Sequence, residues 1–429
     1  MKKISILLAA LMCLCLCGCG SEKAACAAPA EKEAMQFGLM TDKTEFPVEE
    51  IFAAPPFDPA ECTVWTANCE DYVAMRVNPW DGQIIAKISN GEEMMLLGWD
   101  EQCAYVRYGD SEGYVPDDSI KPSDADYFAK ALDVVIPTDT YSYEQMMADI
   151  DVLAERYPDL VETEIAGQSE LGRDIPVIRI GDVNAEKHVF LQGAIHGREH
   201  MTAWCLMAMA DYWLDNGILE YGNICWHIMP MVNPDGVIIS QTGELTEEQQ
   251  ELYKTDIPTG YFPKDIEKYA AQWKANGKGT DINRNFPAGW EYIIDFRRPS
   301  AAYFRGETPF STAEAKILRD YSLSYDFDVT LSYHSSGSII YWQYGTKQPV
   351  NDLSRELGKA VAAVTGYLRV GGSGVVGGGY KDWAINTLEI PSLTIEIGSG
   401  DSPLDERELY SIFARNYMVL PAVAGWLAG

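Results

Sequence analysis

Residues 193–202, GAIHGREHMT, bring two of the chain's five histidines together with an arginine and a glutamate. The segment directly follows HVFLQ, an apolar run that is typical of a buried strand. His196 and Glu199 are three residues apart, so both side chains can reach one ion from a tight turn between a strand and a helix. Imidazole nitrogens and carboxylate oxygens are ligands that Zn²⁺ accepts, and the spacing therefore predicts a metal site.

Two further apolar runs carry residues suited to metal binding or acid–base chemistry. DVTLSY is followed by His334, and SLTIEIG contains Glu396. Functional groups in open α/β sheets collect beyond the carboxyl ends of the strands. His196, Glu199 and His334 would together supply two imidazoles and one carboxylate, which with water in the fourth position is a catalytic zinc arrangement. The sequence suggests no fourth protein ligand, which argues against a closed structural site.

From about residue 140 onwards, helices and strands alternate, and these elements must position the metal-binding and acid–base groups. Strands are expected at 175–181, 188–194, 224–232, 328–334 and 392–398, and helices at 143–158, 201–217 and 406–428. This alternation predicts an α/β fold with a largely parallel sheet that helices cover on both faces.

The region from about 58 to 123 has a different, all-β character. Short apolar runs are separated by Asn-Pro, Asp-Gly, Asn-Gly and Gly-Asp turns, a spacing that suits a small barrel. The segments AMRVNP, IIAKISNGEEMMLLG and YVRYGDSEGYVPDDSI resemble bacterial SH3-like domains of cell-wall proteins. The resemblance implies either peptidoglycan binding or a spacer that positions the following domain, and both interpretations stay open.

The first 19 residues are interpreted as an export signal, because two lysines precede an apolar stretch too short to span a bilayer. The sequence LCGC, ending at Cys19, resembles the bacterial lipobox and implies a lipoprotein lipidated at Cys19, with an ordinary cleaved signal as the alternative. Residues 20–57 are interpreted as a tether. We therefore expect an exported protein that only its lipid holds to the outer face of a bacterial membrane.

Composition narrows the classes of partner. The 429 residues include 33 basic and 64 acidic ones, and a net charge of −31 would repel nucleic acid and anionic membrane surfaces. A chain of this length is longer than one ordinary domain, and its hydrophobic content of 47% indicates that most of it folds. The sequence contains no Cys-x-x-Cys pair, so a zinc site built from cysteines is not expected. Cys62, Cys69 and Cys103 are close enough in sequence for one disulfide, whereas Cys205 and Cys225 lie in apolar runs typical of a core.

Residues from about 140 to 428 resemble the zinc metallocarboxypeptidases, the family of carboxypeptidase A. Seven segments occur in the family's order: GQSELGRDIPVIRIG, GAIHGREH, NPDG, DINRNFP, SYHSSG, GGYKDW and IPSLTIEIG. The resemblance implies a mixed eight-stranded sheet between helices over residues 124–429, preceded by the small all-β barrel at 58–123. It also implies one Zn²⁺ per chain and a metallopeptidase that acts as a monomer on peptide or muropeptide substrates.

The resemblance assigns roles to the metal-site residues. His196, Glu199 and His334 match the zinc ligands, and Glu396 matches the general base that takes a proton from the zinc-bound water. Asp281 matches a carboxylate that orients the first zinc histidine, with a turn cap as the alternative. The other three histidines, His188, His200 and His227, are expected to be structural.

Substrate-binding residues follow from the same motifs. Asn283 and Arg284 match the pair that binds the terminal carboxylate of the substrate, a task that suits the planar guanidinium fork. Arg198 matches a further arginine that lines the substrate site.

Two departures from the family pattern stand out. The arginine that stabilises the oxyanion is absent before DINRN. Lys278 is the nearest cation, with Lys274 behind it, and it is either a replacement or a solvated loop lysine. A tyrosine that covers the substrate is also missing from its usual place, and Tyr380, beside a glycine-rich loop, is the nearest one.

Lys381 lies where the family places the base of the pocket for the last side chain of the substrate. A lysine there would favour a carboxylate-bearing side chain, and a surface lysine is the alternative. Bacterial members that cleave the γ-D-glutamyl–meso-diaminopimelate bond resemble this chain at GGYKDW. We therefore expect an exported zinc peptidase of cell-wall peptides. The alternatives are a carboxypeptidase that removes acidic C-terminal residues and an inactive wall-binding lipoprotein.

Overall fold

A computed structural model of the chain describes residues 57–429, except 80, 218–222, 295 and 373–376. The predicted signal segment with Cys19 and all but the last residue of the predicted tether lie outside the described residues. Part of the glycine-rich loop before Tyr380 also lies outside them. Within the described ranges, no helix has the length and apolar character needed to cross a membrane.

The first described region forms an antiparallel sheet of seven strands in the order β3-β2-β6-β5-β4-β1-β7. The strands are β1 Val64–Ala67, β2 Tyr72–Arg76, β3 Ile84–Ser89, β4 Glu93–Asp100, β5 Cys103–Tyr108, β6 Ser111–Pro116 and β7 Ile120–Pro122. The all-β character of this region is confirmed, and its SH3-like identity stays a prediction. Cys62, Cys69 and Cys103 are free thiols, so the disulfide considered from their spacing is not formed.

The larger sheet has eight strands in the order β14-β13-β15-β12-β10-β11-β9-β8. The strands are β8 Val161–Gln168, β9 Asp174–Ile180, β10 Lys187–Gln192, β11 Ile224–Met229, β12 Val329–Ser335, β13 Ile339–Tyr341, β14 Leu368–Val370 and β15 Ser392–Ile397. The four central strands β15, β12, β10 and β11 are parallel, whereas β9 and β13 run antiparallel to their inner neighbours. The predicted mixed eight-stranded sheet is therefore confirmed.

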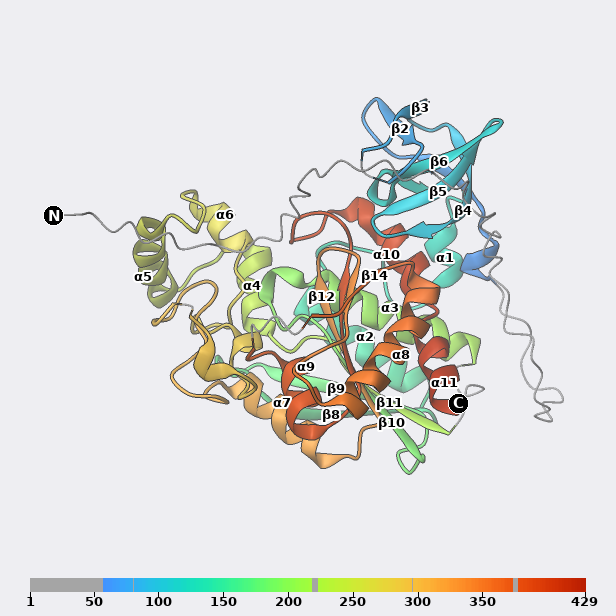
Figure 1. Cartoon of the computed structure of the whole chain (residues 1–429). Helices are drawn as coiled ribbons and strands as arrows, with labels where there is room; N and C mark the ends of the chain where they lie inside the picture. The colour runs from blue at the N-terminus through green and yellow to red at the C-terminus, as the bar shows by residue number, and fades with distance from the viewer. Residues whose placement is uncertain (1–56, 80, 218–222, 295, 373–376) are drawn as a thin grey trace, which may run out of the picture. The chain divides into compact units, whose positions relative to one another are not determined.

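The helices are α1 Tyr127–Ala131, α2 Tyr143–Arg156, α3 Met201–Asn216, α4 Pro234–Thr242, α5 Glu247–Asp256, α6 Ile266–Ala271, α7 Ala313–Ser324, α8 Gln348–Thr365, α9 Tyr380–Trp383, α10 Leu409–Asn416 and α11 Val419–Ala428. Most of them pack around this sheet, whereas α5 and α6 lie to one side of it and share a separate apolar cluster (Figure 1). Buried side chains of α2, α3, α8, α10 and α11 share one core with the sheet, and those of α7 and α9 share a second. The sheet thus lies between two apolar layers.

Alternation along β10 shows how the two layers arise. Val189 and Leu191 belong to the core that contains α3, and Phe190 between them belongs to the core that contains α7. All three side chains are fully buried. Successive residues of a strand point to opposite faces, so a strand covered on both faces carries a continuous apolar run, here residues 189–191.

The predicted C-terminal helix at 406–428 is two helices, α10 and α11. Pro421 has no backbone N–H, and its ring would clash with the carbonyl of Tyr417 in a continuous helix. That carbonyl instead accepts a hydrogen bond from the indole of Trp213 in α3. The chain therefore breaks at 417–418 and resumes with Pro421 in the first turn of α11.

Candidate active site

The turn after β10 carries the first two predicted ligands. His196 precedes a short 3₁₀ turn, Gly197–Glu199, and its Nδ1 lies 2.8 Å from Oε1 of Glu199. The turn packs against α4 so closely that a Cβ on Gly197 would lie 2.4 Å from the carbonyl group of Gly236. Only glycine fits there, which explains the small residue between His196 and Arg198.

The NPDG segment supports this turn from the other side. Asn233 caps α4 by accepting a hydrogen bond from the N–H of Gly236 at 2.9 Å. Its Nδ2 donates to the carbonyls of Ile195 and Ala275, at 3.2 and 3.0 Å. The buried amide of Asn233 therefore fixes Ile195, the residue before His196, relative to α4 and to the loop that contains Ala275.

His334 and Glu396 reach the same place from the neighbouring strands. They are register partners in the parallel pair of β12 and β15, so their side chains project to one face of the sheet. Nδ1 of His334 lies 2.9 Å from Oε2 of Glu199 and 3.2 Å from Nδ1 of His196. The structure thus brings together all three predicted metal ligands, and each of them is at least 95% buried.

This arrangement fits a cation. The two Nδ1 lone pairs converge with one carboxylate, and the ligand atoms lie within 4.8 Å of one another. Burial opposes ionisation of Glu199, yet the charges and hydrogen bonds of His196 and His334 hold the pKa of that carboxyl well below its usual range. The site therefore presents an ionised carboxylate and two imidazoles, which is the ligand set of a catalytic zinc centre.

Glu396 has a different environment from Glu199. Burial raises the pKa of its carboxyl to about 7; the charge of Glu199 adds to the rise, and His334 and Lys274 oppose it. A carboxyl whose pKa lies near neutrality can both accept and return a proton, which is what a general base needs.

A second layer orients the two histidines. Asp281 is fully buried, with Oδ1 3.3 Å from Nε2 of His196 and Oδ2 3.6 Å from Nζ of Lys274. Burial opposes its charge, but Lys274 and His196 hold the pKa of Asp281 well below its usual range. Asn283 places Nδ2 3.4 Å from Nε2 of His334. The outer nitrogen of each ring thus has a polar neighbour, which leaves both Nδ1 atoms directed at the metal position.

A cavity of about 500 Å³ opens over these groups. Its lining is almost entirely polar and consists of His196, Arg198, Glu199, Gln272, Lys274, Asn283, Arg284, His334, Ser335, Ser336, Tyr341, Glu396, Asp401 and Ser402. Arg198, Lys274 and Arg284 are its cations. Three positive side chains around one polar cavity suit a substrate with one or more carboxylates.

Three predicted residues do not line this cavity. Lys278 is half exposed and pairs with Glu170 at 2.8 Å, so the cation brought to the cavity from that segment is Lys274. Tyr380 is fully buried, and its hydroxyl bonds Ser322 at 2.8 Å, which prevents it from covering a substrate. Nζ of Lys381 bonds Asp382 at 2.6 Å and the carbonyl of Gln343 at 3.0 Å.

Some residues at the cavity were not identified from the sequence. Tyr341 ends β13 and lines the cavity, whereas sequence spacing pointed to Tyr380. Asp401 and Ser402 lie five and six residues after Glu396, beyond the end of β15. The rule that function gathers beyond strand ends would have found Asp401 and Ser402 if it had been applied to the residues after β15.

The chain is similar in sequence to known peptidases. The sequence model of the zinc carboxypeptidase family matches residues 146–422. The chain is 32% identical over 287 residues to gamma-D-glutamyl-L-diamino acid endopeptidase 1 of Lysinibacillus sphaericus, a match that covers 64% of this chain and 69% of that protein. It is 27% identical over 265 residues to carboxypeptidase B of Astacus astacus, covering 58% and 82% of the two chains.

Among solved structures, carboxypeptidase A from Helicoverpa armigera is similar to this chain with a TM-score of 0.54 at 22% identity. The match covers 68% of this chain and 75% of that chain. The likeness concerns the fold, and it agrees with the mixed eight-stranded sheet and the helices on its two faces.

Proposed function

The chain belongs to the zinc carboxypeptidase family, and we propose that it is an exported peptidase that cleaves cell-wall peptides at the γ-D-glutamyl–meso-diaminopimelate bond. The observation that carries the proposal is the site itself, where a two-histidine, one-carboxylate trio and Glu396 share a cavity with three cations. Support for the substrate comes from the 32% identity to a relative named as a gamma-D-glutamyl-L-diamino acid endopeptidase.

The residues of the chain divide the work of hydrolysis. His196, Glu199 and His334 would hold Zn²⁺, which supplies a Lewis acid that polarises the scissile carbonyl and activates water. Glu396 accepts the proton of the attacking water and returns it to the leaving amine. Arg284 binds the free carboxylate of the substrate, and that contact places the scissile bond next to Glu396.

The charge pattern of the cavity also supports a diaminopimelate end. That side chain ends in an ammonium and a carboxylate, and the cavity offers the exposed carboxylate of Asp401 as well as the cations. A pocket for acidic residues alone would gain nothing from Asp401, because like charges repel. Asp401 therefore favours a zwitterionic side chain over a purely acidic one.

The decisive experiment incubates the mature protein with purified wall tri- and tetrapeptides and with L-peptides that end in Glu. Mass spectrometry follows the products, with and without a zinc chelator, and Glu396→Gln serves as the inactive control. Chelator-sensitive release at the diaminopimelate bond supports the proposal. Cleavage of only the Glu-terminated peptides would instead identify a carboxypeptidase with acidic preference, and no turnover with zinc bound would identify an inactive wall-binding protein.

Export, lipidation and wall binding are further parts of the proposal. We expect wild-type protein in the membrane fraction and the Cys19→Ala protein outside it, because the lipid would be the only anchor. Binding of the full chain to insoluble peptidoglycan would assign a wall-binding role to residues 58–123. Absence of binding would leave this region as a spacer in front of a monomeric peptidase.

A further inference from the structure

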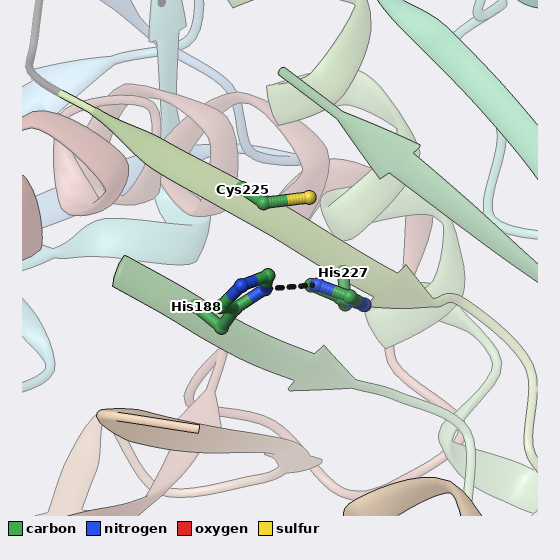
Figure 2. Close-up of side chains that lie close together, drawn as sticks. All are labelled: His188, Cys225 and His227. Carbon is green, nitrogen blue, oxygen red and sulfur yellow. Dashed lines mark hydrogen bonds between the residues drawn. The ribbon is translucent and has the colours of Figure 1, made fainter. Parts of the chain in front are cut away.

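A second cluster of metal-binding side chains lies on β10 and β11, away from the residues that line the active-site cavity. His188 belongs to β10, and Cys225 and His227 belong to β11. Their ligand atoms, imidazole nitrogens and Sγ, lie within 4.8 Å of one another. Figure 2 shows the two rings facing each other, with the Cys225 thiol alongside, and Nδ1 of His188 lies 2.9 Å from Nε2 of His227.

Strand register explains why the three side chains meet. In the parallel pair of β10 and β11, His188 is the partner of Cys225, and Phe190 is the partner of His227. Residues two apart on a strand point to the same face, so all three ligands share the face that carries Phe190. The cluster is therefore fixed by two strands of the sheet and needs no loop to form it.

His227 is already held as a metal ligand would be. Its Nδ1 lies 2.7 Å from the hydroxyl of Tyr321, and its ring packs against Tyr325 and Phe327 with centroids 4.5 and 4.9 Å apart. A fixed Nδ1 leaves Nε2 directed at His188 and Cys225. Ligating histidines in proteins are oriented by this kind of bond to the other ring nitrogen.

The charges around the cluster permit a cation. Arg179 is the positive group that neighbours it, as the register partner of His227 on β9. Its guanidinium is bound to Glu162 at 2.8 Å, to the hydroxyl of Tyr325 at 2.5 Å and lies 3.8 Å from Glu164. These two carboxylates offset part of the positive charge of this arginine.

We propose that His188, Cys225 and His227 bind a second transition-metal ion, of the borderline-soft class that Zn²⁺ represents, separately from the catalytic metal. Tetrahedral zinc with bonds of about 2.0–2.1 Å to nitrogen and about 2.3 Å to sulfur keeps its ligand atoms roughly 3.3–3.6 Å apart. Nδ1 of His188 and Nε2 of His227, which are 2.9 Å apart, thus need to separate by only a few tenths of an ångström. Cys225 loses its thiol proton on binding, and the proton between the rings moves to the outer nitrogen of the same ring.

Water would complete the coordination of the proposed metal from the side of His188. His227 and Cys225 are fully buried, whereas His188 is half-buried, so the cluster is open to solvent at that ligand. A metal bound there would tie the start of β10 to β11 and stabilise the fold. The inference does not depend on the proposed substrate, because no residue of the active-site cavity takes part.

Cobalt can test the proposal on the full mature chain, because a Co²⁺–thiolate bond gives a near-ultraviolet charge-transfer band. The catalytic trio contains no sulfur, so the band reports only on a cysteine-containing site. We expect two Co²⁺ per chain at saturation, together with the band. In His196→Ala the band should persist with one Co²⁺ per chain.

Matched variants locate the band. Cys225→Ser should remove the band and one Co²⁺, whereas Cys205→Ser, at an equally buried free cysteine outside the cluster, should retain both. His188→Gln changes the half-buried ligand and should also lose the band. This variant keeps the test valid if Cys225→Ser does not fold. A single Co²⁺ per chain without the band, or a band that survives in Cys225→Ser, would overturn the proposal.

Discussion

The active-site cluster and the second cluster share only β10, and they differ in how they are built. Beyond the carboxyl ends, His196 and Glu199 occupy a turn after β10, and His334 lies near the end of β12. Nearer the amino ends, His188, Cys225 and His227 lie within β10 and β11 themselves. The first cluster shares its cavity with a base and three cations, whereas aromatic rings pack against the second. Ligand type alone therefore does not distinguish a catalytic site from a structural one.

Electrostatics sharpen the contrast. In the active site the pKa of Glu199 is held well below its usual range by the two histidines, and burial raises that of Glu396 to about 7. Two carboxylates in one cavity thus differ in their pKa values, as the proposed roles of Glu199 as an ionised ligand and Glu396 as a proton carrier require. In the second cluster, burial lowers the pKa of His227 to about 3, and the charges of His188 and Arg179 add to this effect. That ring stays neutral and carries out no acid–base chemistry near pH 7.

The largest effect is expected from Glu396→Gln. Removing a general base costs about 10²–10⁴-fold in rate, and the amide keeps the shape of the side chain. We expect kcat to fall by that factor while both metals remain bound, measured by peptide hydrolysis and by metal analysis of the same preparation. Retained turnover would show that Glu396 is not the base, and the two clusters would then no longer differ in acid–base chemistry.

The loop after β15 gives a pH test of how the active site is supported. Glu408 accepts backbone hydrogen bonds from Ser399 at 2.6 Å and Gly400 at 3.2 Å, next to Asp401 and Ser402 in the cavity lining. Burial raises the pKa of Glu408 to about 7, although these hydrogen bonds oppose the rise.

An acid whose pKa is raised in the folded state contributes stability below its unfolded pKa, and this contribution is lost as the pH rises through the folded value. The free energy of unfolding of Glu408→Gln should therefore rise relative to wild type between pH 4.5 and 7, by on the order of 3 kcal/mol. Chemical denaturation at several pH values measures this, with the exposed Glu406→Gln as control. A difference independent of pH would contradict the assignment.

Carboxylate binding is tested by Arg284→Lys. The lysine keeps the charge but loses the fork that binds a carboxylate in two places. We expect kcat/KM to fall roughly 30-fold, equivalent to about 2 kcal/mol for a charge-assisted hydrogen bond, on substrates with a free C-terminus. Amidated substrates should be equally poor for wild type and variant. An equal loss on both kinds of substrate would mean that Arg284 acts elsewhere.

Much of the architecture could be predicted from sequence because local patterns determine it. Strict apolar runs identified the central strands, and Gly217 marked the end of α3, where its backbone is left-handed. The zinc trio was found because two ligands are three residues apart and the third follows another strand. The break before α11 depends on Pro421, a single residue within an otherwise continuous helical pattern.

Residues whose role depends on the direction of a side chain could not be placed in this way. Tyr380 and Lys381 belong to a family motif, but a hydrogen bond to Ser322 and one to Asp382 direct them into the protein. Spacing along the chain contains no information about such tertiary partners. The second cluster could not be predicted from the sequence for the same reason, since His188 and Cys225 meet only through strand register.

The smallest effect concerns two lysines that sequence could not separate. Lys274 lines the cavity, with its Nζ 3.6 Å from Oδ2 of Asp281, whereas the half-exposed Lys278 pairs with Glu170 and does not line the cavity. We expect Lys274→Ala to reduce kcat about 10-fold, because a cation near developing oxyanion charge acts mainly in the transition state. Lys278→Ala serves as the matched control and should stay within about twofold of wild type, because exposed ion pairs contribute little. The reverse order of effects would return the oxyanion role to Lys278 and would mean that this loop rearranges when substrate binds.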